Sequence, residues 1–145
     1  KEYRDKVREE KRLKIINLIH RNSINPTNNL PHPAQRIEAA MEEAKVKIDE
    51  FKKAEDQVKE IVDKIKVILP IRFEIRELQI RIPAQFAGKS YSTLKQYGTI
   101  LKDEWQNDGS LLTLLEIPAG LQTELFDRLN SLTHGEVESK IIHVK

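Results

Sequence analysis

The sequence predicts an α+β protein, in which a three-helix bundle at residues 1–69 is followed by a ferredoxin-like βαββαβ domain at residues 70–145. Two observations support this prediction. Apolar residues recur with a helical period of about 3.6 as far as Leu69, and with a period of about two after Pro70. The elements of the second half also follow the order of a split βαβ fold. The change of period at Pro70 therefore predicts two domains.

Three amphipathic stripes predict the helices of the bundle. Each stripe places apolar residues three or four positions apart, so that they share one helix face. The stripes are Leu13, Ile15, Ile16, Leu18 and Ile19; Ile37, Ala40, Met41, Ala44 and Ile48; and Val58, Ile61, Val62, Ile65 and Leu69. We expect the third helix to end near Leu69, because proline disfavours helical geometry in the residue before it. Residues 11–69 are expected to be helical apart from two loops.

A long, kinked strand is predicted directly after Pro70. Its apolar residues alternate first in one phase and then in the other, as Ile71, Phe73 and Ile75 and then Leu78, Ile80 and Ile82. A slip of one residue moves side chains to the opposite face of a strand. We therefore expect a β-bulge near Arg76 and Glu77.

Glycines bound the remaining elements of the second domain. A helix at about residues 87–97 is expected to end at Gly98, and a hairpin is expected to turn at residues 107–109. A last helix, with leucines on one face, is expected to stop at Gly135 before the final strand. Trp105 lies beside the hairpin turn. We expect it to pack on the sheet rather than to remain exposed as a protein-contact anchor.

The composition excludes some kinds of site but does not indicate a function. Of its 145 residues, 39% are hydrophobic and 33% are charged, and none is cysteine. Disulfides and thiolate metal sites are therefore excluded, and no apolar run approaches the roughly 20 residues of a membrane-spanning helix. The net charge is +2, but residues 1–22 carry eight Lys or Arg against four Asp or Glu. Positive charge is therefore concentrated in the first helix.

The basic first helix has two interpretations. Its cations can contact a phosphate backbone, which binds them without reading sequence, or they can form a solvated face paired with glutamates. The residues predicted to contact RNA are Lys11, Arg12, Lys14 and Arg21, with Arg36 near the start of the second helix. Arg36 faces the unfavourable positive end of the helix dipole. We therefore expect it to have a partner, either a phosphate or one of the glutamates Glu9, Glu10, Glu42 and Glu43.

The sequence offers no recognisable motif for catalysis, for a cofactor or for a metal. Its five glycines are scattered rather than gathered in a phosphate-binding loop. Its four histidines are not at a metal-ligand spacing, and no acidic residue completes a recognisable triad. The strand at residues 111–115 lacks the aromatic residues on which an RNA-recognition motif stacks bases. We therefore expect no enzyme activity, no cofactor and no metal.

A proline-punctuated segment leads into the second helix. Asn25-Pro26 and Pro31-His32-Pro33 favour turn and extended conformations, and Pro33 can occupy the first helical position. We expect His32, between two prolines, at the protein surface or at the helix start, and not as a catalytic base.

This segment resembles the archaeal branch of the Shwachman-Bodian-Diamond syndrome (SBDS) protein family, whose members carry a similar Asn-Pro loop, Pro-His-Pro and Arg-Ile-Glu. The resemblance continues at residues 11–17, 104–110 and 117–122. It covers two of the family's three domains. We expect the family's N-terminal domain to be absent from this chain, which agrees with the missing initiator methionine.

The resemblance implies a ribosome maturation factor rather than an enzyme. Family members bind the large ribosomal subunit and rRNA and, with an elongation-factor-2-like GTPase, help to release the anti-association initiation factor 6. The resemblance further implies a cytoplasmic monomer with no membrane partner, and it makes His32 part of a conspicuous motif of uncertain role. The alternative is a protein-binding adaptor in RNA processing that makes no direct RNA contact through this chain.

Overall fold

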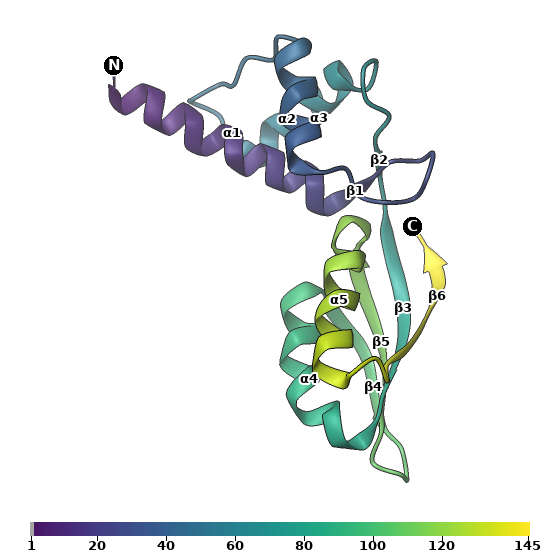
Figure 1. Ribbon diagram of the computed structural model, residues 1–145. Coiled ribbons are helices and arrows are strands. Elements are labelled where there is room, and N and C mark those ends of the chain that lie inside the picture. The colour runs from purple at the N-terminus through teal and green to yellow at the C-terminus, as the bar shows by residue number, and fades with distance from the viewer. Residues whose placement is uncertain (1) are drawn as a thin grey trace. The chain divides into compact units, whose positions relative to one another are not determined.

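The computed structural model describes residues 2–145 and divides into two compact units, the first ending at Phe73 and the second running from Glu74 to Lys145. In Figure 1 the first unit is mainly helical, whereas the second contains a sheet with helices on one face. The predicted α+β fold class is confirmed. No helix within residues 2–145 is both long enough and apolar enough to cross a membrane.

The first unit contains the three predicted helices, α1 (Glu2–Asn22), α2 (Ala34–Glu43) and α3 (Ala54–Ile65). α1 packs against α2 and α3 through its C-terminal half, where its buried residues are Ile15, Ile16 and Ile19. The other two stripes complete the core with Ile37, Ala40, Met41, Ile61, Val62 and Ile65. Burial of each large apolar side chain favours folding by roughly 1.5–3 kcal/mol.

α2 ends earlier than its apolar stripe predicts. The stripe continues to Ile48, but the helix stops at Glu43, and Lys45 then adopts a left-handed conformation with φ 55°. The backbone N–H of Val46 donates to the carbonyl of Met41 at 3.0 Å, which closes the last turn of the helix. Ile48 therefore lies in the following loop, where it still packs on the core.

A two-stranded ribbon in the first unit is absent from the sequence-based prediction. β1 (Ser23–Ile24) pairs antiparallel with β2 (Arg72–Phe73). The expectation that residues 11–69 contain only helices and loops is therefore wrong. Strands of two residues are too short for a period of two to appear in a sequence, which explains the miss. Ile71, just before β2, is buried in the core of this unit.

The second unit has the predicted βαββαβ order. Its strands form one antiparallel sheet in the order β4-β5-β3-β6, with α4 and α5 on one face (Figure 1). The elements are β3 (Ile75–Ile82), α4 (Ala84–Tyr97), β4 (Thr99–Trp105), β5 (Leu111–Pro118), the 3₁₀-helix η1 (Ala119–Leu121), α5 (Gln122–Thr133) and β6 (Glu138–Val144). The buried core is apolar and includes Leu78, Ile80, Ile82, Leu94, Leu111, Leu115, Ile117, Leu125 and Leu129. The ferredoxin-like arrangement is confirmed.

Charged residues are buried near the beginning of β3, where the sequence predicts an apolar alternation. Phe73 and Ile75 are largely exposed, whereas Glu74 and Arg76 are buried. Arg76 donates to the Glu74 carboxylate at 2.5 Å and to the side-chain oxygen of Gln122 at 2.5 Å. Each charge compensates the other, and this compensation is what makes the burial of both tolerable.

The predicted turns of the second unit are confirmed, but the bulge expected in β3 is wrong. β3 pairs with β5 without a shift, and the extra residue is Ile142 of β6, because Glu77 pairs with His143 and Leu78 with Ile141. The pairing of β3 with β6 shifts register between Glu77 and Leu78. Gly109, in the β4–β5 hairpin, has φ 86°, and Gly135, after α5, has φ 83°, conformations that glycine adopts without steric cost. Trp105 is 56% exposed, so the expectation that it packs on the sheet is wrong. It ends β4, an edge strand whose residues are mostly exposed.

Candidate nucleic-acid interface

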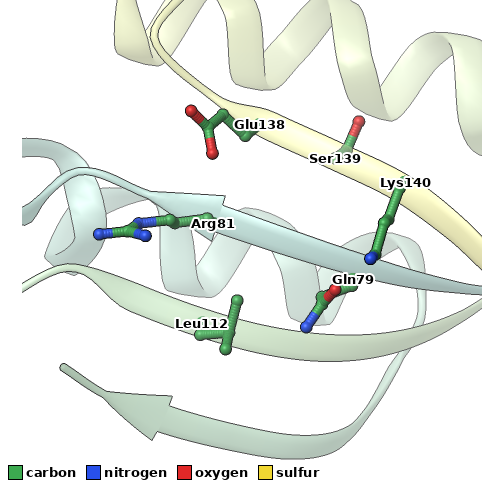
Figure 2. Close-up of a pocket in the computed structure, with 6 residues that line it drawn as sticks. All are labelled: Gln79, Arg81, Leu112, Glu138, Ser139 and Lys140. Atoms are coloured by element: carbon green, nitrogen blue, oxygen red, sulfur yellow. The ribbon is translucent and has the colours of Figure 1, made fainter.

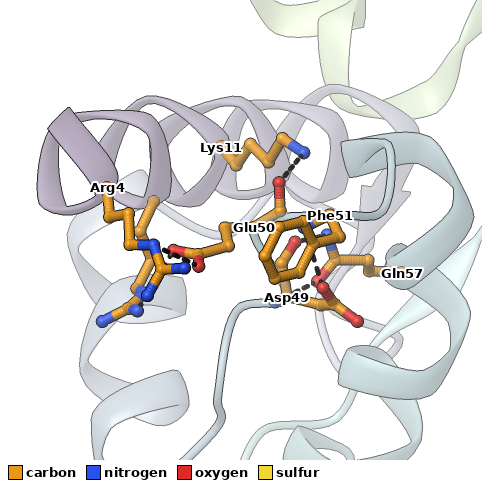
Figure 3. A network of polar contacts seen from close by, with 7 residues as sticks. Arg4, Lys11, Asp49, Glu50, Phe51 and Gln57 are labelled. Atoms are coloured by element: carbon orange, nitrogen blue, oxygen red, sulfur yellow. Dashed lines mark hydrogen bonds and ion pairs between the residues drawn. The ribbon is translucent and has the colours of Figure 1, made fainter.

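Lys11, a predicted phosphate contact, binds to its own protein. Its Nζ donates to the backbone carbonyl of Glu50 at 2.6 Å (Figure 3) and to that of Lys52 at 2.7 Å. An ammonium group has three donors, and two of them are occupied here. Lys11 therefore joins α1 to residues 45–53, which we call the Phe51 loop.

The Phe51 loop is held by hydrogen bonds on both sides of its aromatic residue. The buried Gln57 accepts from the backbone N–H of Asp49 at 2.9 Å and donates to the carbonyls of Asp49 at 2.7 Å and Lys52 at 3.0 Å. The Asp49 carboxylate accepts from the backbone N–H of Phe51 at 2.8 Å. These contacts fix the backbone before and after Phe51.

Phe51 projects from this loop with 83% of its surface exposed (Figure 3). Its neighbour Glu50 forms ion pairs with Arg4 at 3.6 Å and Arg8 at 3.2 Å, both on α1. No motif draws attention to Phe51 in the sequence, although an aspartate two positions before it is typical of an Asx turn. Four exposed lysines of the loop form no side-chain hydrogen bond or ion pair with residues 2–145, namely Lys45, Lys47, Lys52 and Lys53.

Arg12, a second predicted contact, lies among three glutamates. Its guanidinium is 2.8 Å from the carboxylate of Glu38, 3.1 Å from Glu9 and 3.4 Å from Glu42, and its side chain is 21% exposed. The hydrogen bond to Glu38 raises the pKa of Arg12, while burial opposes this effect. A phosphate would have to replace these carboxylates, so the geometry favours a structural role for Arg12.

The other three predicted contacts lie at the surface. Lys14 is 3.2 Å from Glu55 in an exposed ion pair, and such pairs contribute little to stability. Arg21 and Arg36 are exposed, and neither side chain forms a hydrogen bond or ion pair with residues 2–145. The glutamate partner expected for Arg36 is therefore not found in this part of the chain. Both guanidinium groups are available to an external anion.

His32 is buried, although it directly precedes α2 and was expected at the surface or helix start. Its Nε2 is 2.6 Å from the carbonyl of Pro70, and its own carbonyl accepts from Nδ1 of His20 at 2.6 Å. A carbonyl can only accept, so Nε2 carries the hydrogen. The buried Nδ1 has no hydrogen-bond partner within residues 2–145. His32 thus joins the end of α1 to the segment that enters β2.

Two family models match this chain. The model described as SBDS protein, domain II matches residues 13–74, and the model described as SBDS protein, C-terminal domain matches residues 76–144. The chain belongs to the SBDS family. The two SBDS matches meet close to Phe73, where the structure divides into its two units.

Similar proteins of the SBDS family include two archaeal relatives, each named ribosome maturation protein SDO1 homolog. The relative from Methanothermobacter thermautotrophicus is 48% identical, and that from Aeropyrum pernix is 41% identical, each over 97% of this chain. The chain spans 61% and 60% of the lengths of these two relatives. A crystal structure of a hypothetical protein is similar with a TM-score of 0.43 and 17% identity, over 64% of this chain and 47% of that one.

The four-stranded sheet of the second unit has a shallow depression between β3, β5 and β6, on the face that α4 and α5 do not cover. Figure 2 shows its lining, which consists of Gln79, Arg81, Leu112, Glu138, Ser139 and Lys140. None of these side chains is aromatic, so the depression offers no ring for base stacking. Within residues 2–145 no group of three or more His, Cys, Asp or Glu is arranged to hold a metal ion.

Proposed function

We propose that this chain is part of a cytoplasmic ribosome maturation factor that binds the large ribosomal subunit and catalyses no covalent reaction. The observation that carries the proposal is its pair of SBDS domains, together with relatives named ribosome maturation proteins. In this proposal the factor binds rRNA and helps an elongation-factor-2-like GTPase to release the anti-association initiation factor 6. It acts by binding one arrangement of the subunit more tightly than another, because only differential affinity shifts such an equilibrium.

Arg21 and Arg36 are the phosphate contacts that the geometry favours. The His20–His32 hydrogen bond joins the end of α1, which carries Arg21, to the segment leading into α2, which carries Arg36. The first turn of α2 contains no acidic residue. A phosphate bound near that turn would interact favourably with both the helix dipole and the guanidinium of Arg36.

Lys14 is a weaker candidate, since its exposed partner Glu55 can be exchanged for a phosphate. Lys11 and Arg12 support the rRNA proposal least, because their charges are already bound by carbonyls and carboxylates. The same two residues give support to the second candidate function, a protein-binding adaptor in RNA processing that makes no direct RNA contact through this chain.

Co-sedimentation with purified archaeal large ribosomal subunits over a salt series tests the proposal. The chain should bind, and its affinity should fall as the salt concentration rises. Replacing Arg21→Gln and Arg36→Gln together should lower the logarithmic salt slope by between about 1 and 2, because each phosphate contact contributes about 0.7–0.9.

The matched control is a variant with Lys59→Gln and Arg128→Gln, which removes the same charge from two exposed helical positions. Its salt slope should stay close to that of the unchanged chain. Absence of binding at low salt would contradict the proposal. Binding that is insensitive to salt and to both double variants would favour the adaptor.

A further inference from the structure

We infer that Phe51 is a stacking contact for an unpaired RNA base, and that Lys11 is a positioning residue that holds it in place. The inference rests on the proposed function only for the source of that RNA, the large ribosomal subunit. It arises from the combination of exposure and a fixed backbone at Phe51. Tyr3 and Val67 are exposed as well, but Phe51, which is 83% exposed, lies on a loop whose backbone is held by hydrogen bonds on both sides of the ring.

The ring of Phe51 is attached to a backbone that is held in place. The carbonyls of Glu50 and Lys52, on either side of Phe51, both accept from Nζ of Lys11. Gln57, in α3, and the Asp49 carboxylate hold the backbone of the same stretch of the loop (Figure 3). A contact residue that is already held in one conformation loses less entropy when a partner binds.

Positive charge surrounds the ring of Phe51. The two acidic residues of the Phe51 loop are occupied, Asp49 by a backbone N–H and Glu50 by two arginines. The four exposed lysines of the loop have no such partners within residues 2–145. A shallow depression beside the loop has a net positive lining, because its three lysines, Lys47, Lys52 and Lys64, outnumber its two acidic residues, Asp49 and Glu60. The accessible charge next to Phe51 is therefore positive.

A segment of single-stranded RNA fits both the exposed ring and the lysines around it. Single-stranded RNA presents phosphates to lysines and flat base faces to aromatic rings, and stacking on a ring tolerates any base. A purely apolar pocket on a protein would cover the ring but would leave the loop lysines without anions. The combination of ring and free ammonium groups therefore favours an unpaired RNA segment.

Tryptophan fluorescence tests the stacking directly, because the chain contains a single tryptophan. In a chain carrying Phe51→Trp and Trp105→Phe, the introduced indole reports on position 51. Titration with poly(rA) at low salt should quench its fluorescence. The unchanged chain, whose Trp105 is also exposed, is the control and should show little quenching.

Affinity for the same RNA separates stacking from apolar contact. Phe51→Leu keeps an apolar side chain without a ring, and it should lower the affinity about tenfold, whereas Phe51→Trp should retain it. Lys11→Met should reduce the affinity but leave the logarithmic salt slope unchanged. A direct phosphate contact by Lys11 would instead lower that slope by about 0.7.

The outcomes distinguish this inference from the proposed function. Quenching at position 51 together with a weakened Phe51→Leu variant supports stacking, even if the chain fails to sediment with large subunits. Absence of quenching with unchanged affinity of Phe51→Leu overturns it. If Phe51→Leu weakens sedimentation with large subunits but not binding to poly(rA), the ring contacts a ribosomal protein and the RNA inference is wrong.

Discussion

The helix α1 and the Phe51 loop are both rich in basic residues, but their charges face different groups. Lys11 and Arg12, on α1, bind backbone carbonyls and carboxylates of their own unit. Lys45 and Lys47, in the loop, are exposed and form no side-chain hydrogen bond or ion pair with the described residues, 2–145. The count of positive charges in a segment therefore does not locate a surface for anions. What decides is whether the fold supplies those charges with partners.

The two regions also depend on each other. Lys11 binds carbonyls that lie 39 and 41 residues further along the chain. One cation of α1 thereby fixes the backbone that presents Phe51 and its neighbouring lysines. Weakening the internal contacts should therefore cost stability, whereas removing the free charges should not.

The largest loss of stability is expected from Gln57→Leu, in the Phe51 loop's network of internal hydrogen bonds. The change removes partners from one backbone N–H and two carbonyls of the Phe51 loop. Partial rehydration limits the cost, and we expect the free energy of unfolding to fall by about 2–3 kcal/mol. Urea denaturation followed by circular dichroism measures it. Gln57→Glu keeps the acceptor for the Asp49 N–H but turns a buried carboxylate towards two carbonyl oxygens, so it should lose at least as much. A loss below about 1 kcal/mol in Gln57→Leu would show that these bonds do not fix the loop.

Lys11→Met should have the next largest effect. It keeps the apolar part of the side chain but removes two charge-assisted hydrogen bonds, at an expected cost of about 2 kcal/mol in the free energy of unfolding. Lys47→Met is the matched control, because this exposed lysine has no partner within residues 2–145, and it should change stability by less than about 0.5 kcal/mol. If urea denaturation gives similar losses for both variants, the internal contacts of Lys11 do not stabilise the chain, and the proposed difference between α1 and the loop is wrong.

The smallest effect concerns Lys14, an exposed α1 cation whose partner Glu55 is also exposed. The backbone N–H of Glu55 and the side chain of Lys14 lower the pKa of the Glu55 carboxyl from its ordinary 4.5. A lowered folded-state pKa contributes stability that is complete above the unfolded-state value and is lost as the pH falls through the folded-state value.

Glu55→Gln should therefore destabilise the chain slightly at neutral pH and not at all well below pH 4.5. Urea denaturation at a series of pH values, compared with the unchanged chain, measures the difference. A destabilisation of constant size at every pH would mean that the loss arises from packing rather than from charge.

Local patterns allow much of the fold to be predicted from the sequence. Apolar spacing predicts the three helices, but the apparent change of phase after Pro70 predicts a bulge in β3, whereas the extra residue is Ile142 of β6. Burial of Glu74 and Arg76 is not predictable in this way, because each charge is tolerated only through the other. The early end of α2 is missed because the apolar stripe continues into a loop that packs on the same core.

The candidate interface is less predictable than the fold, since it depends on contacts between distant segments. The sequence shows the positions of Arg21 and Arg36, but it does not show that neither side chain has a partner among residues 2–145. It likewise gives no sign that Lys11 and Arg12 have several. An Asx turn at Asp49 is readable from the sequence, whereas the exposure of Phe51 follows only from the fold.

Salt-dependent binding to archaeal large ribosomal subunits by two triple variants tests the central claim most directly. One variant carries Lys45→Gln, Lys47→Gln and Lys52→Gln in the Phe51 loop, and the other carries Lys11→Met, Arg12→Gln and Lys14→Gln in α1. Both remove three positive charges, and circular dichroism must show that both remain folded. The account predicts that the logarithmic salt slope falls by about 2 in the loop variant and by less than about 1 in the α1 variant. Equal losses, or a larger loss in the α1 variant, would contradict it.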